Sequence, residues 1–372
     1  MTLFRNYSLF PVRLHLVVCG LMLLLGAEPA RAQIRTVLVS PVPGDPVASG
    51  TALRNALAGI PSSSSTDRWL LKIEPGIYDV GTTSIRMRSW VDIEGSGIGV
   101  TTIRGSAPAY DATIRGANNA ELRLLTVEAL GNTATPFPVI AMANSDASPR
   151  LYRVKLFAIG DGAWGVRNIN AAPVIEECEI TVSSTSTANM DSVGIAFRGT
   201  PPPAGRSSIF RSKIYVSGAK NNYGVFMGEA QFVTEIRDSR VDAVGGTTAH
   251  GVYAVSSSWT GQETLRIRDT EIYSSGGSSA SYGINFEPGT SIVLNVNESR
   301  VWGSTYGIRQ GGAVPMGVQG SFVLGATQAI RAEGNLSVAS THLEGGPVNA
   351  QGWYGCMGVW DENGVFFTNS CP

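Results

Sequence analysis

The stretch Leu265-Arg-Ile-Arg-Asp-Thr-Glu-Ile272 decides the fold of this 372-residue chain. It places an aliphatic residue at Ile267, a small residue three positions later at Thr270 and a second aliphatic residue at Ile272. The same spacing recurs in eight copies that lie 20 to 34 residues apart, and self-similarity at such a period indicates a repeat architecture. The copies begin at Leu151, Ile175, Ile209, Ile236, Ile267, Val296, Val318 and Val338.

Each copy predicts two short strands joined by a bend. Side chains on one face of a strand recur at even steps, so two inward residues three positions apart have lost that parity. The chain must therefore turn a corner between Ile267 and Thr270. Coils of this kind, stacked by parallel pairing at about 4.8 Å, satisfy every strand backbone except those at the two ends. The repeat therefore predicts a parallel β-helix.

Equivalent positions of successive coils carry similar side chains, as stacking requires. The middle position of the repeat holds Cys178, Ser212, Ser239 and Thr270. Small side chains fit a crowded internal corner, and a thiol in a column of hydroxyl residues favours a structural role for Cys178 over a catalytic one.

A second element, a glycine followed by Val or Ile, follows six of the copies. Tyr282-Gly-Ile284 is one example, and the glycine is usually preceded by an aromatic or apolar residue. His250 occupies the position that Tyr223, Tyr282 and Tyr306 hold in other copies, so we interpret it as a structural residue too.

We expect a cap at each end of the stack, because open sheet edges invite aggregation. The segment 49–60 predicts an N-terminal helix with Ser49 or Thr51 as its N-cap and Pro61 after its end. Its apolar residues share one helical face: Leu53, Ala56, Leu57 and Ile60.

Two cysteines mark the C-terminal cap. Cys356 and Cys371 flank a stretch in which Glu362-Asn-Gly364 lies between apolar runs like a hairpin turn. In an oxidising compartment we expect these cysteines to pair. Closing a loop of about 15 residues stabilises a fold by roughly 3 kcal/mol in the chain-entropy model.

Residues 1–32 have the order of a secretory signal peptide: two arginines, an apolar run over 14–25 and Ala30-Arg-Ala32. That run is too short to span a membrane. We therefore expect a secreted or periplasmic protein with no membrane segment after cleavage. The remaining chain divides into an N-terminal cap with the first coil (33–84), the parallel β-helix (85–345) and the C-terminal cap (346–372).

Charge and ligand residues exclude several function classes. The 28 Lys and Arg balance 29 Asp and Glu, which argues against a nucleic-acid-binding face, a disordered tail or a coiled coil. After residue 32 the chain holds only His250 and His342, no Cys-x-x-Cys and no Asp-x-Asp, so we expect no metal and no cofactor. The oligomeric state stays open.

Three N-terminal segments carry a resemblance to a known superfamily. Leu71–Tyr78, Val91–Gly97 and Thr102–Gly105 resemble the opening of the pectin-lyase-like right-handed β-helix superfamily, pectin methylesterases especially, and residues 150–345 resemble its generic repeat. The resemblance implies an all-β, single-stranded right-handed parallel β-helix of about ten coils with both caps. Such repeats occur in lyases, hydrolases, esterases, adhesins and phage proteins alike, so they indicate fold more than function.

The resemblance to pectin methylesterases implies Asp161 and Asp191 as candidate catalytic residues, since these enzymes use a nucleophilic Asp and an acid/base Asp. Gly160-Asp161-Gly162 keeps the aspartate of the family's Gln-Asp-Thr-Leu but lacks its glutamine, and Val80 replaces the glutamate of Gly-x-Tyr-x-Glu. Two carboxylates on neighbouring coils act as acid and base when their environments differ. The alternative is a turn role, because each precedes a Gly-Val/Ile strand.

Exposed arginines and aromatic residues form the candidate binding set. Arg198, Tyr253 and Arg268 lead it. Aromatic rings stack on sugar faces, so a flat platform of them would bind an extended polysaccharide. The alternative is that many of these rings fill the core or shield a sheet edge. The remaining aromatic candidates are Tyr215, Phe226, Tyr273, Phe286 and Trp302.

These observations favour a secreted β-helix scaffold that contacts carbohydrate or another cell-envelope surface without a complete catalytic constellation. The rival hypothesis is a pectin methylesterase-like or other uronate-polysaccharide-active enzyme. A second alternative is a structural or adhesive module.

Overall fold

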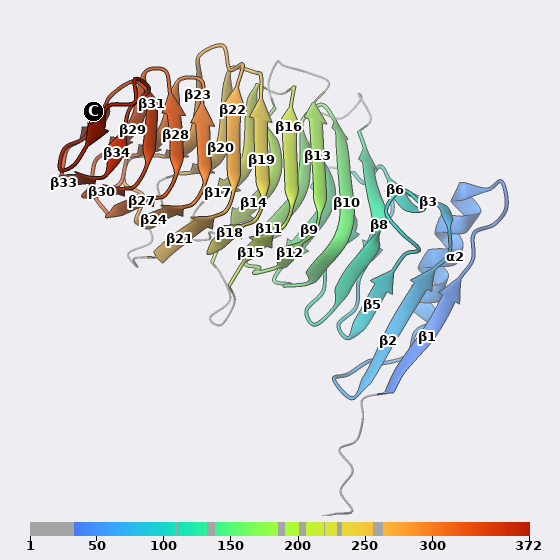
Figure 1. Cartoon of the computed structure of the whole chain (residues 1–372). Helices are drawn as coiled ribbons and strands as arrows, with labels where there is room; N and C mark the ends of the chain where they lie inside the picture. Colours follow the sequence, from blue (N-terminus) through green and yellow to red (C-terminus); the bar gives the residue numbers. More distant parts are fainter. Residues whose placement is uncertain are drawn as a thin grey trace, which may run out of the picture.

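The computed structural model shows a single stack of short parallel strands, with helix α2 at one end and the C-terminus at the other (Figure 1). The predicted signal peptide lies outside the described residues. No helix in the described part is long and apolar enough to cross a membrane. The structure describes residues 33–108, 110–131, 138–184, 190–200, 206–218, 220–228, 233–255 and 263–372.

One face of the stack is an eleven-stranded parallel sheet, one strand from each coil, in agreement with the predicted number of about ten coils. Its strands in order are β4 (Ile85–Arg86), β7 (Ala112–Arg115), β9 (Val139–Ser145), β11 (Ala163–Ile169), β14 (Ser192–Arg198), β17 (Asn221–Met227), β20 (Thr248–Ala254), β23 (Ala280–Phe286), β26 (Tyr306–Gln310), β29 (Gln328–Ala332) and β32 (Val348–Ala350).

A 24-stranded sheet forms the rest of the wall and bends into two arms. Strands β8 (Glu121–Leu130) and β10 (Arg150–Gly160) run through both arms. The first arm adds β1 (Gln33–Val39), β2 (Asp67–Ile73), β5 (Val91–Glu94), β12 (Val174–Glu176), β15 (Ser208–Phe210), β18 (Glu235–Arg237), β21 (Glu263–Arg268), β24 (Ile292–Asn297), β27 (Met316–Gln319), β30 (Leu336–Ala339) and β33 (Tyr354–Met357). The second arm adds β3 (Gly76–Gly81), β6 (Thr101–Gly105), β13 (Glu179–Ser184), β16 (Lys213–Ser217), β19 (Arg240–Val244), β22 (Glu271–Ser275), β25 (Arg300–Gly303), β28 (Phe322–Gly325), β31 (His342–Gly345), β34 (Val359–Trp360) and the antiparallel β35 (Phe366–Phe367).

The predicted corner lies between the two arms. In each of the eight copies, the residue before the middle position has a positive φ, for example 51° at Asp238 and 48° at Asp269. A left-handed residue reverses the parity of a strand, which explains how two inward side chains come to lie three positions apart. Only Gly320 adopts this conformation freely, since for other residues it costs about 1–2 kcal/mol.

A ladder of hydroxyl groups stabilises this corner. The amide of Ser212 donates to Ser239 Oγ at 3.1 Å, and Ser239 Oγ donates to the Arg237 carbonyl at 2.7 Å. The pattern repeats from coil to coil, and Cys178 receives the same support because its amide donates to Ser212 Oγ at 3.1 Å. At the bend this amide no longer meets a backbone carbonyl of the neighbouring strand. The hydroxyl of the next coil accepts its hydrogen bond instead. The further members are Thr270, Ser299, Ser321 and Thr341.

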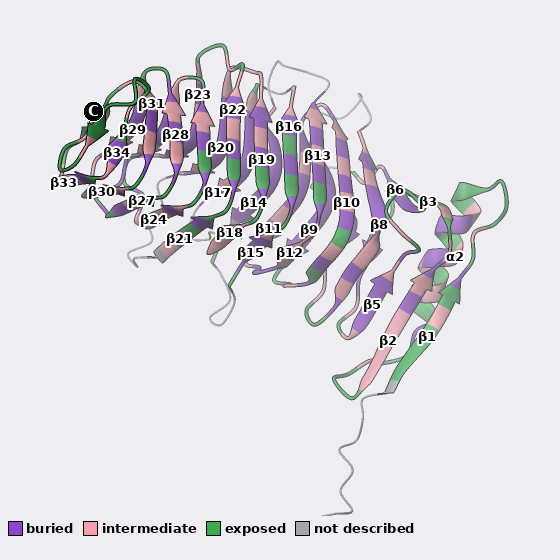
Figure 2. Cartoon of the chain, in the orientation of Figure 1, coloured by how far each residue is buried: buried purple, intermediate pink, exposed green. Residues whose placement is uncertain are grey.

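Buried apolar side chains fill the inside of the stack. The purple segments of the strands in Figure 2 mark the buried residues. The inward column of the eleven-stranded sheet places Phe197, Met227, Ala254 and Phe286 over one another. Phe286 is fully buried there. Its prediction as part of a surface platform is therefore wrong, because its parity in β23 directs the ring into the core.

Helix α2 (Pro46–Gly59) closes the N-terminal end of the core. Leu53 and Leu57 are buried, so the predicted apolar face is confirmed. The predicted N-caps are wrong: the cap is Asp45, whose carboxylate accepts from the Ala48 amide at 2.9 Å. Pro46 at the first helical position moves the start upstream, and Ser49 instead bonds the Asp45 carbonyl from inside the first turn.

The predicted disulfide between Cys356 and Cys371 is confirmed, with 5.2 Å between the two Cα atoms. Cys356 continues an inward column that contains Val318 and Val338. The disulfide therefore holds the C-terminal segment at the last coil, where the column would otherwise end open.

Candidate functional site

The outer face of the eleven-stranded sheet carries a column of stacked rings. Tyr223, His250, Tyr282 and Tyr306 occupy one register position in successive coils. Neighbouring ring centroids are 5.0–5.2 Å apart and the planes are within 14° of parallel. This column explains the aromatic ring that precedes the glycine in four of the six Gly-Val/Ile elements.

His250 belongs to this column as a neutral ring. Burial, with a smaller effect from Arg309, lowers its pKa to about 3. Its Nδ1 lies 3.4 Å from the Asn285 amide nitrogen. This position agrees with the interpretation of His250 as a structural residue.

A second column runs beside the first, three positions further along each strand. Phe226 and Tyr253 are partners in it, and their ring centroids lie 5.7 Å apart. Tyr223 of the first column packs against both rings, at 5.4 Å and 4.9 Å. The three rings and the small residues Val193 and Ala196 form an apolar cluster separate from the core, which we call the aromatic cluster.

Arg198 and Tyr253, predicted as binding residues, both contact this cluster. The guanidinium carbon of Arg198 lies 5.0 Å from the Phe226 ring centroid and 5.3 Å from that of Trp164. Arg198 Nε has no hydrogen-bond partner among the described residues. The Tyr253 hydroxyl donates to Glu287 Oε1 at 3.3 Å, and burial followed by the Glu287 charge raises the pKa of Tyr253 to about 12.

Arg268 and the remaining aromatic candidates lie elsewhere. Arg268 is exposed in β21, in the first arm of the other sheet. Tyr215, Tyr273 and Trp302 lie in one column of the second arm, where the last two rings are 3.7 Å apart. The predicted platform is therefore divided between two sheets.

Asp161 and Asp191 precede neighbouring strands of the eleven-stranded sheet. Asp191 is exposed before β14 and accepts from Asn221 at 2.8 Å, and Asn221 accepts in turn from Thr248 at 2.8 Å. Asp161 lies half-buried in the turn before β11. Within the described residues, no hydrogen bond or ion pair joins these aspartates to each other or to an arginine. Their catalytic role stays a prediction.

Sequence reasoning missed a cavity of about 300 Å³ at the N-terminal end of the same face. Its main polar residues are Arg86, Arg115, Ser145 and Arg167, and the ring of Tyr110 forms part of the lining. The only sequence signal is three arginines at one register position in four coils. Irregular turn lengths hide that register until the strands are aligned.

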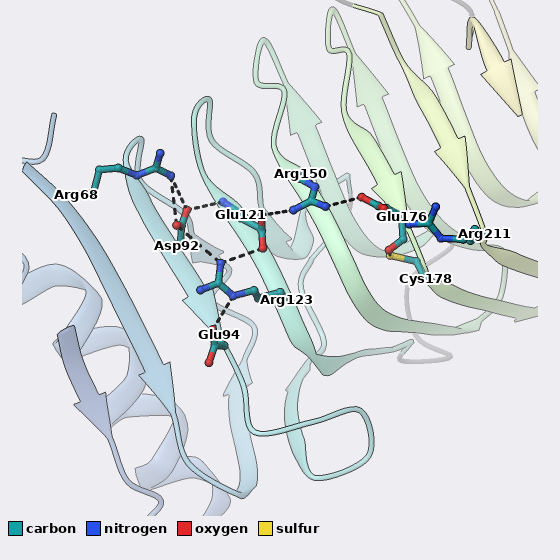
Figure 3. A network of polar contacts seen from close by, with 9 residues as sticks. All are labelled: Arg68, Asp92, Glu94, Glu121, Arg123, Arg150, Glu176, Cys178 and Arg211. Carbon is teal, nitrogen blue, oxygen red and sulfur yellow. Dashed lines mark hydrogen bonds and ion pairs between the residues drawn. The ribbon is translucent and has the colours of Figure 1, made fainter. Parts of the chain in front are cut away.

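Four other arginines, by contrast, are matched by carboxylates in the ladder of Figure 3: Arg68, Arg123, Arg150 and Arg211. Arg123 binds Glu94 at 2.6 Å and Glu121 at 2.9 Å. Arg150 joins Glu121 at 2.7 Å to Glu176, which also binds Arg211. Such an alternating network holds the coils together and leaves its charges compensated.

Metal chemistry receives no support from the described residues, where no three His, Cys, Asp or Glu side chains gather in a metal-binding arrangement.

Comparison with known proteins identifies the fold. No protein-family model matches the chain, and no curated protein matches it either. Among solved structures, the Dettilon tailspike protein superimposes with a TM-score of 0.53 at 12% identity, over 88% of this chain and 61% of the tailspike. The chain therefore spans less than two thirds of that protein.

Two further structures match less well. The catalytic unit of an α-1,3-glucanase from Streptomyces thermodiastaticus has a TM-score of 0.48 at 15% identity, over 92% of this chain and 68% of the enzyme. A pectin methylesterase from Erwinia chrysanthemi has a TM-score of 0.39 at 14% identity, over 90% and 85%. The chain has the pectin-lyase-like fold, a right-handed parallel β-helix.

Proposed function

We propose that this protein is a secreted scaffold that binds an extended carbohydrate along the outer face of its eleven-stranded sheet. The observation that carries the proposal is the aromatic cluster, whose rings pack on the outside of the β-helix, apart from its core. Half-buried Phe226 and Tyr253 present ring surface to the outside at neighbouring coils. Rings of this kind combine a large apolar area with low conformational entropy, which suits the apolar faces of sugars.

Polar groups at the cluster supply the hydrogen bonds that sugar hydroxyls need. Half-buried Arg198 brings its guanidinium donors to the cluster, where Phe226 and Trp164 hold the group in place. Glu287, beside the Tyr253 hydroxyl, offers an acceptor.

Export is part of the proposal. The signal-peptide pattern of residues 1–32 supports it, and so does the Cys356–Cys371 disulfide, because disulfides persist in oxidising compartments. The esterase hypothesis lacks such support, since the described contacts of Asp161 and Asp191 place no arginine or glutamine beside them.

Affinity gel electrophoresis against neutral and acidic polysaccharides tests the proposal. We expect retention of the wild type, and a loss of affinity of about tenfold in Phe226→Ala and Tyr253→Ala. Tyr215→Ala, which removes an exposed ring from β16 in the other sheet, is the matched control. Retention by no polysaccharide, or equal losses in Tyr215→Ala, would refute the proposal.

A further inference from the structure

The cavity on the outer face is a gap in a column of long side chains. Arg86 and Arg115 are cross-strand partners, Ala143 is the next residue of the column and Arg167 follows it. The short side chain of Ala143 leaves the hollow of about 300 Å³ between the arginines. This volume is at the lower end of the range for small-molecule sites.

Three guanidinium groups share a single carboxylate in this cavity. Arg115 binds Asp111 at 2.7 Å, while Arg167 donates to the Tyr110 carbonyl at 3.2 Å. Within the described part of the chain, neither Arg86 nor Arg167 has a carboxylate partner. Arginine keeps its proton in proteins, so the cavity holds uncompensated positive charge.

The ladder of Figure 3 shows what the chain does when such charges serve stability alone. There Arg123 and Arg150 stand opposite Glu94 and Glu121 in the neighbouring coils. At the cavity, Ala143 occupies the position where a carboxylate would complete the alternation. Like charges in direct cross-strand pairs, as at Arg86 and Arg115, destabilise a sheet.

Two features shape the cavity wall. Tyr110 adopts a φ of 60°, and its ring centroid lies 5.9 Å from the Arg167 guanidinium. Burial, followed by repulsion from Arg198, lowers the pKa of Arg167, and an anion placed in the cavity would relieve both effects.

We infer that this cavity binds the acidic group of a sugar residue, with Arg86 and Arg167 as its charged ligands and the Tyr110 ring beside the sugar. The shared chemistry is an oxyanion on a pyranose, either a carboxylate or a sulfate ester. The inference rests on the proposed function and gives its ligand class, an acidic rather than a neutral glycan. Guanidinium groups suit such ligands because their planar donors match two oxygens at once.

Affinity electrophoresis in gels of polygalacturonate, dextran sulfate and neutral dextran tests the inference on the full chain. We expect retention by one or both acidic polymers, which identifies the source of the oxyanion, and a loss of about tenfold in each of Arg86→Gln and Arg167→Gln. Arg266→Gln removes the same charge from an exposed position in β21 and should leave the affinity unchanged.

Filling the gap supplies a second test that does not depend on removing an arginine. Ala143→Glu places a carboxylate between Arg115 and Arg167, so we expect loss of acidic-polymer retention together with a higher Tm. Ala143→Gln fills the same space without charge and should abolish retention without raising Tm. Ligand retention equal to wild type in Ala143→Glu would overturn the inference.

The failure of the cavity and the failure of the aromatic cluster give different results. Equal retention by neutral and acidic gels would refute binding of an acidic group at the cavity, and so would unchanged retention of the Arg86→Gln Arg167→Gln double variant. Neither result would contradict glycan binding at the aromatic cluster. Retention that depends on Arg86 and Arg167 but is unaffected by Phe226→Ala refutes binding at the aromatic cluster and supports binding at the cavity.

Discussion

Ser212 and Ser239 occupy the same corner position in successive coils, and the Ser212 amide donates a 3.1 Å hydrogen bond to Ser239 Oγ. The corner breaks the strand-to-strand pattern, so a side chain takes over the acceptor role that a carbonyl has elsewhere. Both residues are buried, and water cannot replace this acceptor.

Removing one hydroxyl of this ladder should therefore destabilise the fold. We expect Ser239→Ala to lower the free energy of unfolding by about 1–3 kcal/mol, since it leaves a buried amide unpaired. Ser239→Thr keeps the hydroxyl and should stay close to the wild type. Denaturant unfolding measures the difference, with the exposed Ser278→Ala as control; equal stability of the two alanine variants would contradict the ladder.

Cys178 should be inert in the folded protein. Its thiol is buried, and burial raises its pKa to about 12, so no thiolate forms near neutral pH. A thiol reagent at pH 8 should leave Cys178 unlabelled until denaturant is added. Fast labelling of the native protein would show that this corner opens.

The buried His250 gives the fold a defined pH dependence. Its folded-state pKa of about 3 lies below the unfolded value of about 6.5. Between these two pH values His250 is protonated in the unfolded state and neutral in the folded state. The free energy of unfolding should therefore fall as pH drops from about 6.5 toward 3, by up to about 1.4 kcal/mol per pH unit.

His250→Tyr keeps the ring column and removes this titration. Unfolding measured between pH 7 and pH 4.5 should show a shallower loss of stability in the variant than in the wild type. Identical slopes would mean that His250 accepts a proton in the folded state.

The disulfide should stabilise the C-terminal end of the stack. Reduction, or Cys356→Ser with Cys371→Ser, removes the closure of about 15 residues and should cost roughly 3 kcal/mol. Thermal unfolding with and without reductant measures it. An unchanged Tm after complete reduction would show that the cap folds without this bond.

Much of the fold could be predicted from the sequence because the same local constraint recurs from coil to coil. The spacing from Ile267 to Thr270 requires a parity change, and the left-handed Asp269 between them provides it. The helix start was misplaced because Ser49 is as good an N-cap residue type as Asp45. Pro46 at the first helical position and the bond from the Ser49 hydroxyl to the Asp45 carbonyl separate the two.

The site was less accessible from sequence. Arg198 and Tyr253 lie 55 residues apart, yet both contact Phe226 because β14, β17 and β20 are neighbours in one sheet. Arg268 appears equivalent to them by composition, but it belongs to the other sheet. The face of the β-helix on which a residue lies depends on where the preceding corner falls. Because the turns differ in length from coil to coil, the sequence alone does not show which residues share a face.

Hydrogen–deuterium exchange of the protein with a bound oligosaccharide tests the central claim, that glycan binds the outer face of the eleven-stranded sheet, most directly. The account predicts that peptides from β11, β14, β17 and β20 gain protection, while those from β16, β19 and β22 in the second arm stay unchanged. Protection confined to the second arm, or no protection at a saturating concentration of a retained glycan, would contradict it.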